Sequence, residues 1–163
     1  MSENLKGAKL KKIKIVFVCL GNYCRSPMAE AILKTMVDRD GLSDRFEISS
    51  AGTENWDVGL PPDRRSASLL LEHNYQLDPA KRAKLISKNE IQNSDYLVAM
   101  TARIANALGN HDNVCLLMDF LDNPASRDIP DPYPTDTFPQ AFRMIEKGVR
   151  AFYSFLKDKY SLR

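Results

Sequence analysis

Long apolar runs, cysteine and histidine are scarce in this sequence, and each scarcity excludes a class of protein. No stretch of the 163 residues approaches the roughly 20 apolar residues of a membrane span, so we expect no membrane association. The three cysteines are too few, and too odd a number, for a disulfide framework. His73 and His111 are isolated, which argues against a zinc site. No glycine–lysine pair marks a nucleotide-binding loop, and we expect no metal or cofactor.

Charge of one sign is scarce as well, because 23 Lys+Arg face 21 Asp+Glu. Proteins that bind DNA or RNA concentrate positive charge, so we expect no nucleic-acid partner. The chain has 44% hydrophobic residues and no internal repeat or linker, as expected for one domain with a proper core. We expect a flexible polar extension at residues 1–12, one domain at 13–163, and a monomer or weak dimer. No signal-peptide pattern is present, which favours the cytoplasm.

Strand and helix patterns alternate along the chain. Four apolar runs predict strands, at 13–18, 46–50, 96–100 and 114–118. Ser26 with Pro27 predicts the start of the first helix, as cap and first helical residue. Asp63 and Ser87 are the expected caps of two later helices, and a long helix is expected from near Phe138. The fold class is therefore α/β, a single-domain, doubly wound, four-stranded parallel sheet flanked by helices. Ligands bind such sheets at the carboxyl ends of the strands.

The segment that follows the first strand has the spacing of a phosphate-binding loop. A cysteine, five residues and an arginine can wrap around a tetrahedral oxyanion, with backbone N–H groups and a helix N-terminus pointing into the bowl. Arg25 can grip two phosphate oxygens with its planar fork. Gly21 and Asn22 tolerate the left-handed backbone that a tight loop demands. The expected phosphate-binding residues are Leu20, Gly21, Asn22, Tyr23, Cys24 and Ser26.

Cys19 opens this loop and is the candidate nucleophile. The positive field of the helix end and Arg25 favours its thiolate form, which is the reactive one. Ser26 can donate its hydroxyl to the sulfur and steady it as attacker and as leaving group. A buried structural cysteine does not need an arginine six residues later. The loop therefore predicts both phosphate binding and covalent catalysis.

Cleavage of a phosphate ester also needs an acid to protonate the leaving oxygen. Asp131 is the best candidate, in a loop stiffened by Pro130, Pro132 and Pro134. Asp128 and Asp136 compete with it, and an aspartate before proline is also an ordinary turn residue.

The motifs together resemble the low-molecular-weight protein tyrosine phosphatases. The similarity is carried by Cys19–Glu30, Ser50–Thr53, Pro61–Asp63 and Asp131–Tyr133, in that order. The resemblance implies the flavodoxin-like phosphotyrosine phosphatase I fold and hydrolysis of phosphotyrosine in a protein, or of a small aryl phosphate, with release of inorganic phosphate. It implies that Cys19 is the nucleophile, Arg25 the phosphate clamp and Asp131 the general acid and base. It further implies loop support from Asn22, Ser26 and Ser50, and slot walls formed by Trp56 and Tyr133. Trp56 could instead be a packing residue.

The resemblance also implies that Cys24 could form a protective disulfide with Cys19 under oxidation. Alternatively, Cys24 merely fills space in the loop. The sequence departs from the family pattern at three places, which bear on substrate preference more than on activity. Pro134 directly follows the aspartate–proline–aromatic triplet, a supporting histidine is replaced near Lys81, and Thr101 stands where many members have aspartate.

Three rival functions share this architecture. Arsenate reductases relay oxidation through two further cysteines, but residues 76–93 contain no cysteine. Protein arginine phosphatases carry threonine at the position of Tyr23, so Tyr23 favours the tyrosine substrate. Phosphocarrier subunits accept phosphate on a cysteine but need neither Arg25 nor Asp131.

Overall fold

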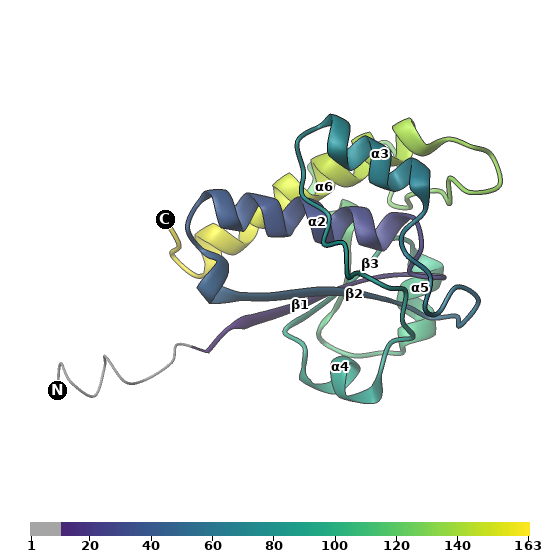
Figure 1. Cartoon of the computed structure of the whole chain (residues 1–163). Helices are drawn as coiled ribbons and strands as arrows, with labels where there is room; N and C mark the ends of the chain where they lie inside the picture. Colours follow the sequence, from purple (N-terminus) through teal and green to yellow (C-terminus); the bar gives the residue numbers. More distant parts are fainter. Residues whose placement is uncertain (1–10) are drawn as a thin grey trace, which may run out of the picture.

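The computed structural model describes residues 11–163, built around a four-stranded, all-parallel sheet in the order β2–β1–β3–β4 (Figure 1). The predicted fold class is confirmed. Of the expected extension at 1–12, all but the last two residues lie outside the described residues. The strands are β1 (Ile13–Cys19), β2 (Phe46–Gly52), β3 (Tyr96–Ala99) and β4 (Val114–Leu116).

The central strand β1 explains the continuous apolar run in the sequence. It pairs with β2 on one side and β3 on the other, so both of its faces are covered by protein. Ile15, Phe17 and Val18 have no exposed surface. A strand buried on both faces must be apolar at every position, which is the observed pattern.

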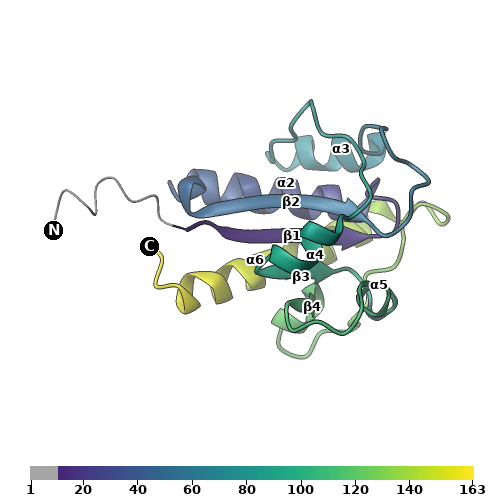
Figure 2. The same ribbon diagram turned by 90° about the horizontal axis from the view of Figure 1, so that it is seen from below.

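Helices cover both faces of the sheet (Figures 1 and 2). α2 (Arg25–Arg39), α3 (Arg64–Glu72) and α6 (Phe138–Lys159) form one layer, and the shorter α4 (Lys88–Asn93) and α5 (Ala102–Leu108) lie on the opposite face. The 3₁₀ turns are η1 (Ser43–Arg45) and η2 (Leu117–Phe120). The apolar stripe of α6 faces the core, where the Phe152 ring meets the edge of Phe17 at 6.1 Å between centroids.

Most predicted helix boundaries are confirmed. The Asp63 side chain accepts a hydrogen bond from the Arg65 N–H at the start of α3, and Ser87 with Glu90 forms a complete capping box at α4. α6 begins at Phe138 as expected.

Several boundaries were predicted wrongly by one or two residues: β1 and β2 extend to Cys19 and Gly52, β3 ends at Ala99, and the start of α2 and the end of β4 also differ. α2 begins at Arg25, with Cys24 rather than Ser26 in the capping position, because the Ser26 hydroxyl is engaged by the Cys19 sulfur and Asn22 instead. The fourth strand ends at Leu116, and the next residues turn into η2 toward α6. There Leu117 packs so closely on Gly148 that a Cβ at Gly148 would lie 2.8 Å from the Leu117 side chain. That close packing favours a turn over continued strand.

Candidate active site

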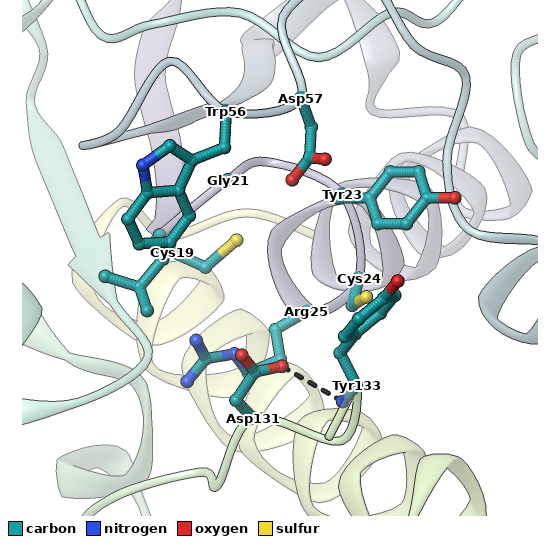
Figure 3. Close-up of a pocket in the computed structure, with 10 residues that line it drawn as sticks. Cys19, Gly21, Tyr23, Cys24, Arg25, Trp56, Asp57, Asp131 and Tyr133 are labelled. Carbon is teal, nitrogen blue, oxygen red and sulfur yellow. Dashed lines mark hydrogen bonds between the residues drawn. The ribbon is translucent and has the colours of Figure 1, made fainter. Parts of the chain in front are cut away.

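The loop between β1 and α2 forms a small cavity at the carboxyl edge of the sheet (Figure 3). Cys19 is the last residue of β1 and Arg25 is the first of α2, so two rigid elements fix the ends of the loop. The cavity has a volume of about 240 Å³, which has room for a small ligand. It is lined by Cys19, Leu20, Gly21, Tyr23, Cys24, Arg25, Trp56, Asp57, Asp131 and Tyr133.

Backbone geometry confirms half of the prediction about Gly21 and Asn22. Asn22 has a φ of 55°, in the left-handed region that a tight loop requires. Gly21 does not have a left-handed backbone, and its lack of a side chain instead leaves room for a neighbouring side chain. A Cβ at Gly21 would collide with the Asp57 carboxylate. Gly52 is needed for a similar reason, because a Cβ there would lie 2.9 Å from the Asn22 nitrogen.

The N-terminus of α2 supplies donors to the cavity. No side chain caps this helix, and its first-turn N–H groups have no partner inside the helix. The helix dipole adds positive potential at the same end, so the site is suited to an anion.

A chain of buried hydrogen bonds leads from the loop to the Cys19 sulfur. The Asn22 side-chain amide donates to the Ser26 hydroxyl at 2.8 Å and to the Ser50 hydroxyl at 2.9 Å. Ser50 in turn donates to Glu30 at 2.5 Å. The Ser26 hydroxyl oxygen also lies 2.9 Å from the Cys19 sulfur, and when Cys19 is a thiolate, which has no proton, the hydroxyl is the donor of that bond. A sulfur that receives a hydrogen bond is stabilised as a thiolate.

Glu30 anchors the far end of this chain and was not predicted. It is buried on α2, one helical turn after Ser26, and it pairs with Lys34 at 2.7 Å and Lys81 at 3.2 Å. Lys81 also donates to the Ser50 carbonyl at 3.0 Å. Burial lowers the pKa of Lys81 below its usual range, against the opposing effect of the Glu30 carboxylate. The departure from the family at Lys81 therefore lies within the loop support.

Arg25 is held in place by a distant segment. Its side chain is buried, and one guanidinium nitrogen donates to the Ile129 carbonyl at 2.9 Å. That bond orients the planar fork and leaves the other nitrogens available to an anion in the cavity.

The three candidate acids occupy different environments. Asp131 lines the cavity beside Arg25, and its carboxylate accepts from the Tyr133 N–H at 3.1 Å (Figure 3). Asp128 instead accepts from the Ala102 N–H at the start of α5, and Asp136 pairs with Arg65. Only Asp131 of the three lies where it could reach a substrate in the cavity.

The expected aromatic walls line the slot. Trp56 is 68% exposed and Tyr133 is 57% exposed, so neither side chain belongs to the core. Tyr23 meets Tyr133 in an edge-on contact, with 6.3 Å between ring centroids. The structure thus places Trp56 at the slot rather than in the interior.

All three cysteines are free thiols. Cys24 is buried at the cavity, and burial, with the carboxylates of Asp63 and Asp131, raises the pKa of its thiol. Cys115 lies on β4, and burial raises its pKa to about 12. Both perturbations favour the unreactive thiol form at neutral pH.

Of the two remaining departures, Thr101 has a local structural role. Thr101 caps α5, its hydroxyl accepting from the Ile104 N–H at 3.1 Å. Pro134 follows Tyr133 in the loop that carries Asp131.

Within residues 11–163, no three His, Cys, Asp or Glu side chains are grouped to hold a metal ion, and no helix is long and apolar enough to cross a bilayer.

Four residues at or beside the site were not predicted from the sequence: Glu30, Gly52, Asp57 and Arg65. Glu30 could have been found from the sequence, because it lies four positions after Ser26 and therefore on the same face of the predicted helix. The others act through spatial neighbours that the local pattern does not show.

A buried cysteine in a loop at a helix N-terminus, with an arginine beside it and a carboxylate across the slot, is the arrangement found in cysteine-dependent phosphatases. The sequence model of the family described as "Low molecular weight phosphotyrosine protein phosphatase" matches residues 14–162. The chain belongs to that family and is an enzyme of it, a phosphoric monoester hydrolase.

Individual relatives agree with this assignment. The low molecular weight protein-tyrosine-phosphatase YfkJ of Bacillus subtilis is 31% identical over 92% of this chain and 99% of its own length. The crystal structure of YfkJ superposes with a TM-score of 0.89, at 30% identity, covering 93% of this chain and 99% of YfkJ. A Drosophila arginine phosphatase has a TM-score of 0.76 and 32% identity, covering 88% of this chain and 98% of its own.

Proposed function

We propose that the protein hydrolyses phosphotyrosine in proteins, or small aryl phosphates, through a phosphocysteine intermediate on Cys19. The observation that carries this proposal is the hydrogen bond between the Cys19 sulfur and the Ser26 hydroxyl, in the loop that lines the cavity. No cofactor takes part in the reaction.

In the first step the Cys19 thiolate attacks phosphorus, and the bond from phosphorus to the tyrosine oxygen breaks. Asp131 gives its proton to that departing oxygen. Arg25 and the N–H groups of the loop stabilise the equatorial phosphate oxygens throughout.

In the second step Asp131, now a carboxylate, takes a proton from water. The resulting hydroxide attacks the phosphocysteine, inorganic phosphate leaves and the thiolate returns. Ser26 supports both steps, because its hydroxyl hydrogen bond stabilises negative charge on sulfur before attack and after departure.

The substrate proposal rests on the shape of the slot. Trp56 and Tyr133 can flank a planar ring, and a slot of this kind leaves a short phosphoserine side chain far from the sulfur. Tyr23, in contact with Tyr133, adds a third aromatic group. The name of one relative supports the same choice, since YfkJ is described as a low molecular weight protein-tyrosine-phosphatase. The reaction needs a reduced thiol, and we therefore place the protein in a reducing compartment, the cytoplasm.

An arginine phosphatase is the second candidate, favoured by the likeness to the Drosophila enzyme. The test is release of phosphate from phosphotyrosine, phosphoserine and phosphoarginine peptides in parallel, with chelator and reductant present. We expect release from phosphotyrosine that is lost in Cys19→Ser. Release mainly from phosphoarginine would overturn the substrate assignment, and silence on all three, or full inhibition by chelator, would overturn the proposed reaction.

A further inference from the structure

The loop that carries Asp131 is anchored at two ends, and only one anchor belongs to the site described above. On the N-terminal side, the Ile129 N–H donates to the Met100 carbonyl at the end of β3, and the Ile129 carbonyl accepts from Arg25, each at 2.9 Å. These bonds fix the backbone just before Asp131. The loop then crosses the protein surface as far as Phe138, where α6 begins.

Arg65, on α3, holds the C-terminal side. One guanidinium nitrogen donates to Asp136 at 3.1 Å. The guanidinium carbon lies 4.1 Å from the centroid of the Phe138 ring and 5.3 Å from that of Tyr133. Arg65 therefore contacts this loop at an acidic side chain, at an aromatic wall of the slot and at the first residue of α6.

The same guanidinium is fixed to the other half of the site. Two of its nitrogens donate to the Asp63 carboxylate, at 3.1 and 3.0 Å. The Asp63 N–H donates to the Tyr23 carbonyl at 2.9 Å, and the Ser66 hydroxyl donates to the Cys24 carbonyl at 3.2 Å. The start of α3 is thereby bound to the phosphate-binding loop, and Arg65 spans the distance from it to the loop of Asp131.

Hydrogen bonds within the loop connect the segment that Arg65 contacts to Asp131. The Thr137 N–H donates to the Pro132 carbonyl at 3.2 Å, and the Tyr133 N–H donates to the Asp131 carboxylate at 3.1 Å. Asp136 adopts a φ of 55°, in the left-handed region that aspartate tolerates in tight turns. Its ion pair with Arg65 connects this turn to α3.

We propose that Arg65 is a positioning residue that holds Asp131 and Tyr133 over the phosphate-binding loop. This inference rests on the proposed function, because it assigns Arg65 a role through the general acid. A fork that joins three carboxylate contacts and two rings cannot be reproduced by a lysine, which carries a compact point charge.

The test compares two substrates that differ in their need for an acid. Phenyl phosphate has a poor leaving group that requires protonation, whereas 4-nitrophenyl phosphate has a good one and depends on it less. We expect Arg65→Met to lower kcat/KM for phenyl phosphate by about tenfold, part of the roughly hundredfold loss that a misplaced group can cause. The value for 4-nitrophenyl phosphate should change by less than about threefold. Arg65→Lys should lie between wild type and Arg65→Met.

Matched variants separate positioning from folding. Arg64 is the exposed neighbour on the same helix, and Arg64→Met should leave the ratio of the two kcat/KM values unchanged. Asp136→Asn, at an exposed site, should lower the ratio of kcat/KM for phenyl phosphate to kcat/KM for 4-nitrophenyl phosphate, as Arg65→Met does. It provides the test if Arg65→Met does not fold. In an Asp131→Ala background, Arg65→Met should cause no further selective loss, because the acid it positions is gone.

Equal losses for both substrates, or a selective loss that persists without Asp131, would overturn the role of Arg65. Failure of the proposed function would look different. In that case Cys19→Ser would retain activity, or Asp131→Ala would leave the ratio of the two substrates unchanged.

Discussion

The two halves of the active site are built differently. The phosphate-binding loop is buried, joins β1 to α2 and is connected by side-chain hydrogen bonds that end on Glu30. The loop of Asp131 lies mostly at the surface, has no regular secondary structure before α6 and is held by contacts from Met100, Arg25 and Arg65. In the proposed reaction, phosphate binding and nucleophilic attack would therefore take place on the loop between β1 and α2, and proton transfer would come from the tethered loop of Asp131.

This difference predicts that the two functions can be separated by mutation. Changes in the buried loop should affect phosphate binding and chemistry together. Changes in the loop of Asp131 should affect proton transfer and leave phosphate binding intact.

The largest expected effect comes from the buried half. Cys19→Ser replaces the thiolate by a hydroxyl that stays protonated, so turnover of 4-nitrophenyl phosphate should fall by more than about a thousandfold. Cys115→Ser is the matched control, since that thiol lies away from the cavity on β4, and its rate should remain near that of wild type. Steady-state kinetics measures both, and substantial turnover by Cys19→Ser would show that another group is the nucleophile.

The exposed half should give a large but selective effect. Asp131→Ala removes the acid, and kcat/KM for phenyl phosphate should fall by about 10² to 10⁴. Competitive inhibition by inorganic phosphate should remain within about threefold of the wild-type value, because the binding loop is untouched. Asp128→Asn is the control and should leave this rate near that of wild type, since Asp128 accepts a hydrogen bond from the Ala102 N–H at the start of α5. Loss of phosphate binding in Asp131→Ala would contradict the separation of the two halves.

A third prediction concerns the stability of the buried half. Lys81→Met leaves the buried Glu30 carboxylate with Lys34 as its one cationic partner, beside the Ser50 hydroxyl, and should lower the free energy of unfolding by about 3 kcal/mol. Lys84→Met breaks a more exposed pair with Glu90 and should cost less than about 1 kcal/mol. Urea denaturation of both variants measures the difference. Equal, small losses would mean that the Lys81–Glu30 pair does not support the loop.

The smallest expected effect is the contribution of the Asp63 carboxylate to stability as a function of pH. Burial would raise the pKa of Asp63, but hydrogen bonds from Arg65 outweigh it and hold the pKa below its usual value. A lowered carboxyl pKa contributes stability above the unfolded-state value, near pH 4, that is lost as pH falls through the folded-state pKa. Asn also caps helices well, so Asp63→Asn removes the charge and keeps the cap.

Wild type should therefore have a higher free energy of unfolding than Asp63→Asn at pH 7, and the difference should shrink as pH falls below about 4. Urea unfolding as a function of pH measures this. A difference that is constant with pH would show that the charge of Asp63 does not contribute.

What could be predicted from the sequence follows the same division. The phosphate-binding loop is contiguous in sequence, so the spacing of Cys19 and Arg25 carries its geometry, and the buried strand before it is visible as an apolar run. The choice of Asp131 over Asp128 and Asp136 could not be made from local pattern, because it depends on which carboxylate reaches the cavity. The contact of Arg65 with Asp136, 71 residues later, leaves no periodic signal. The start of α2 was misplaced for a related reason, because Ser26, which looks like a helix cap in the sequence, instead contacts the Cys19 sulfur.

The most direct test of covalent catalysis by Cys19 is to trap the intermediate. Rapid acid quenching during turnover of 4-nitrophenyl phosphate, followed by peptide mass spectrometry, shows where the phosphoryl group resides. We predict a phosphoryl group on the sulfur of Cys19 that is absent without substrate. A phosphoryl group on any other residue, or full turnover with no phosphorylated peptide in a time course that resolves a single turnover, would contradict it.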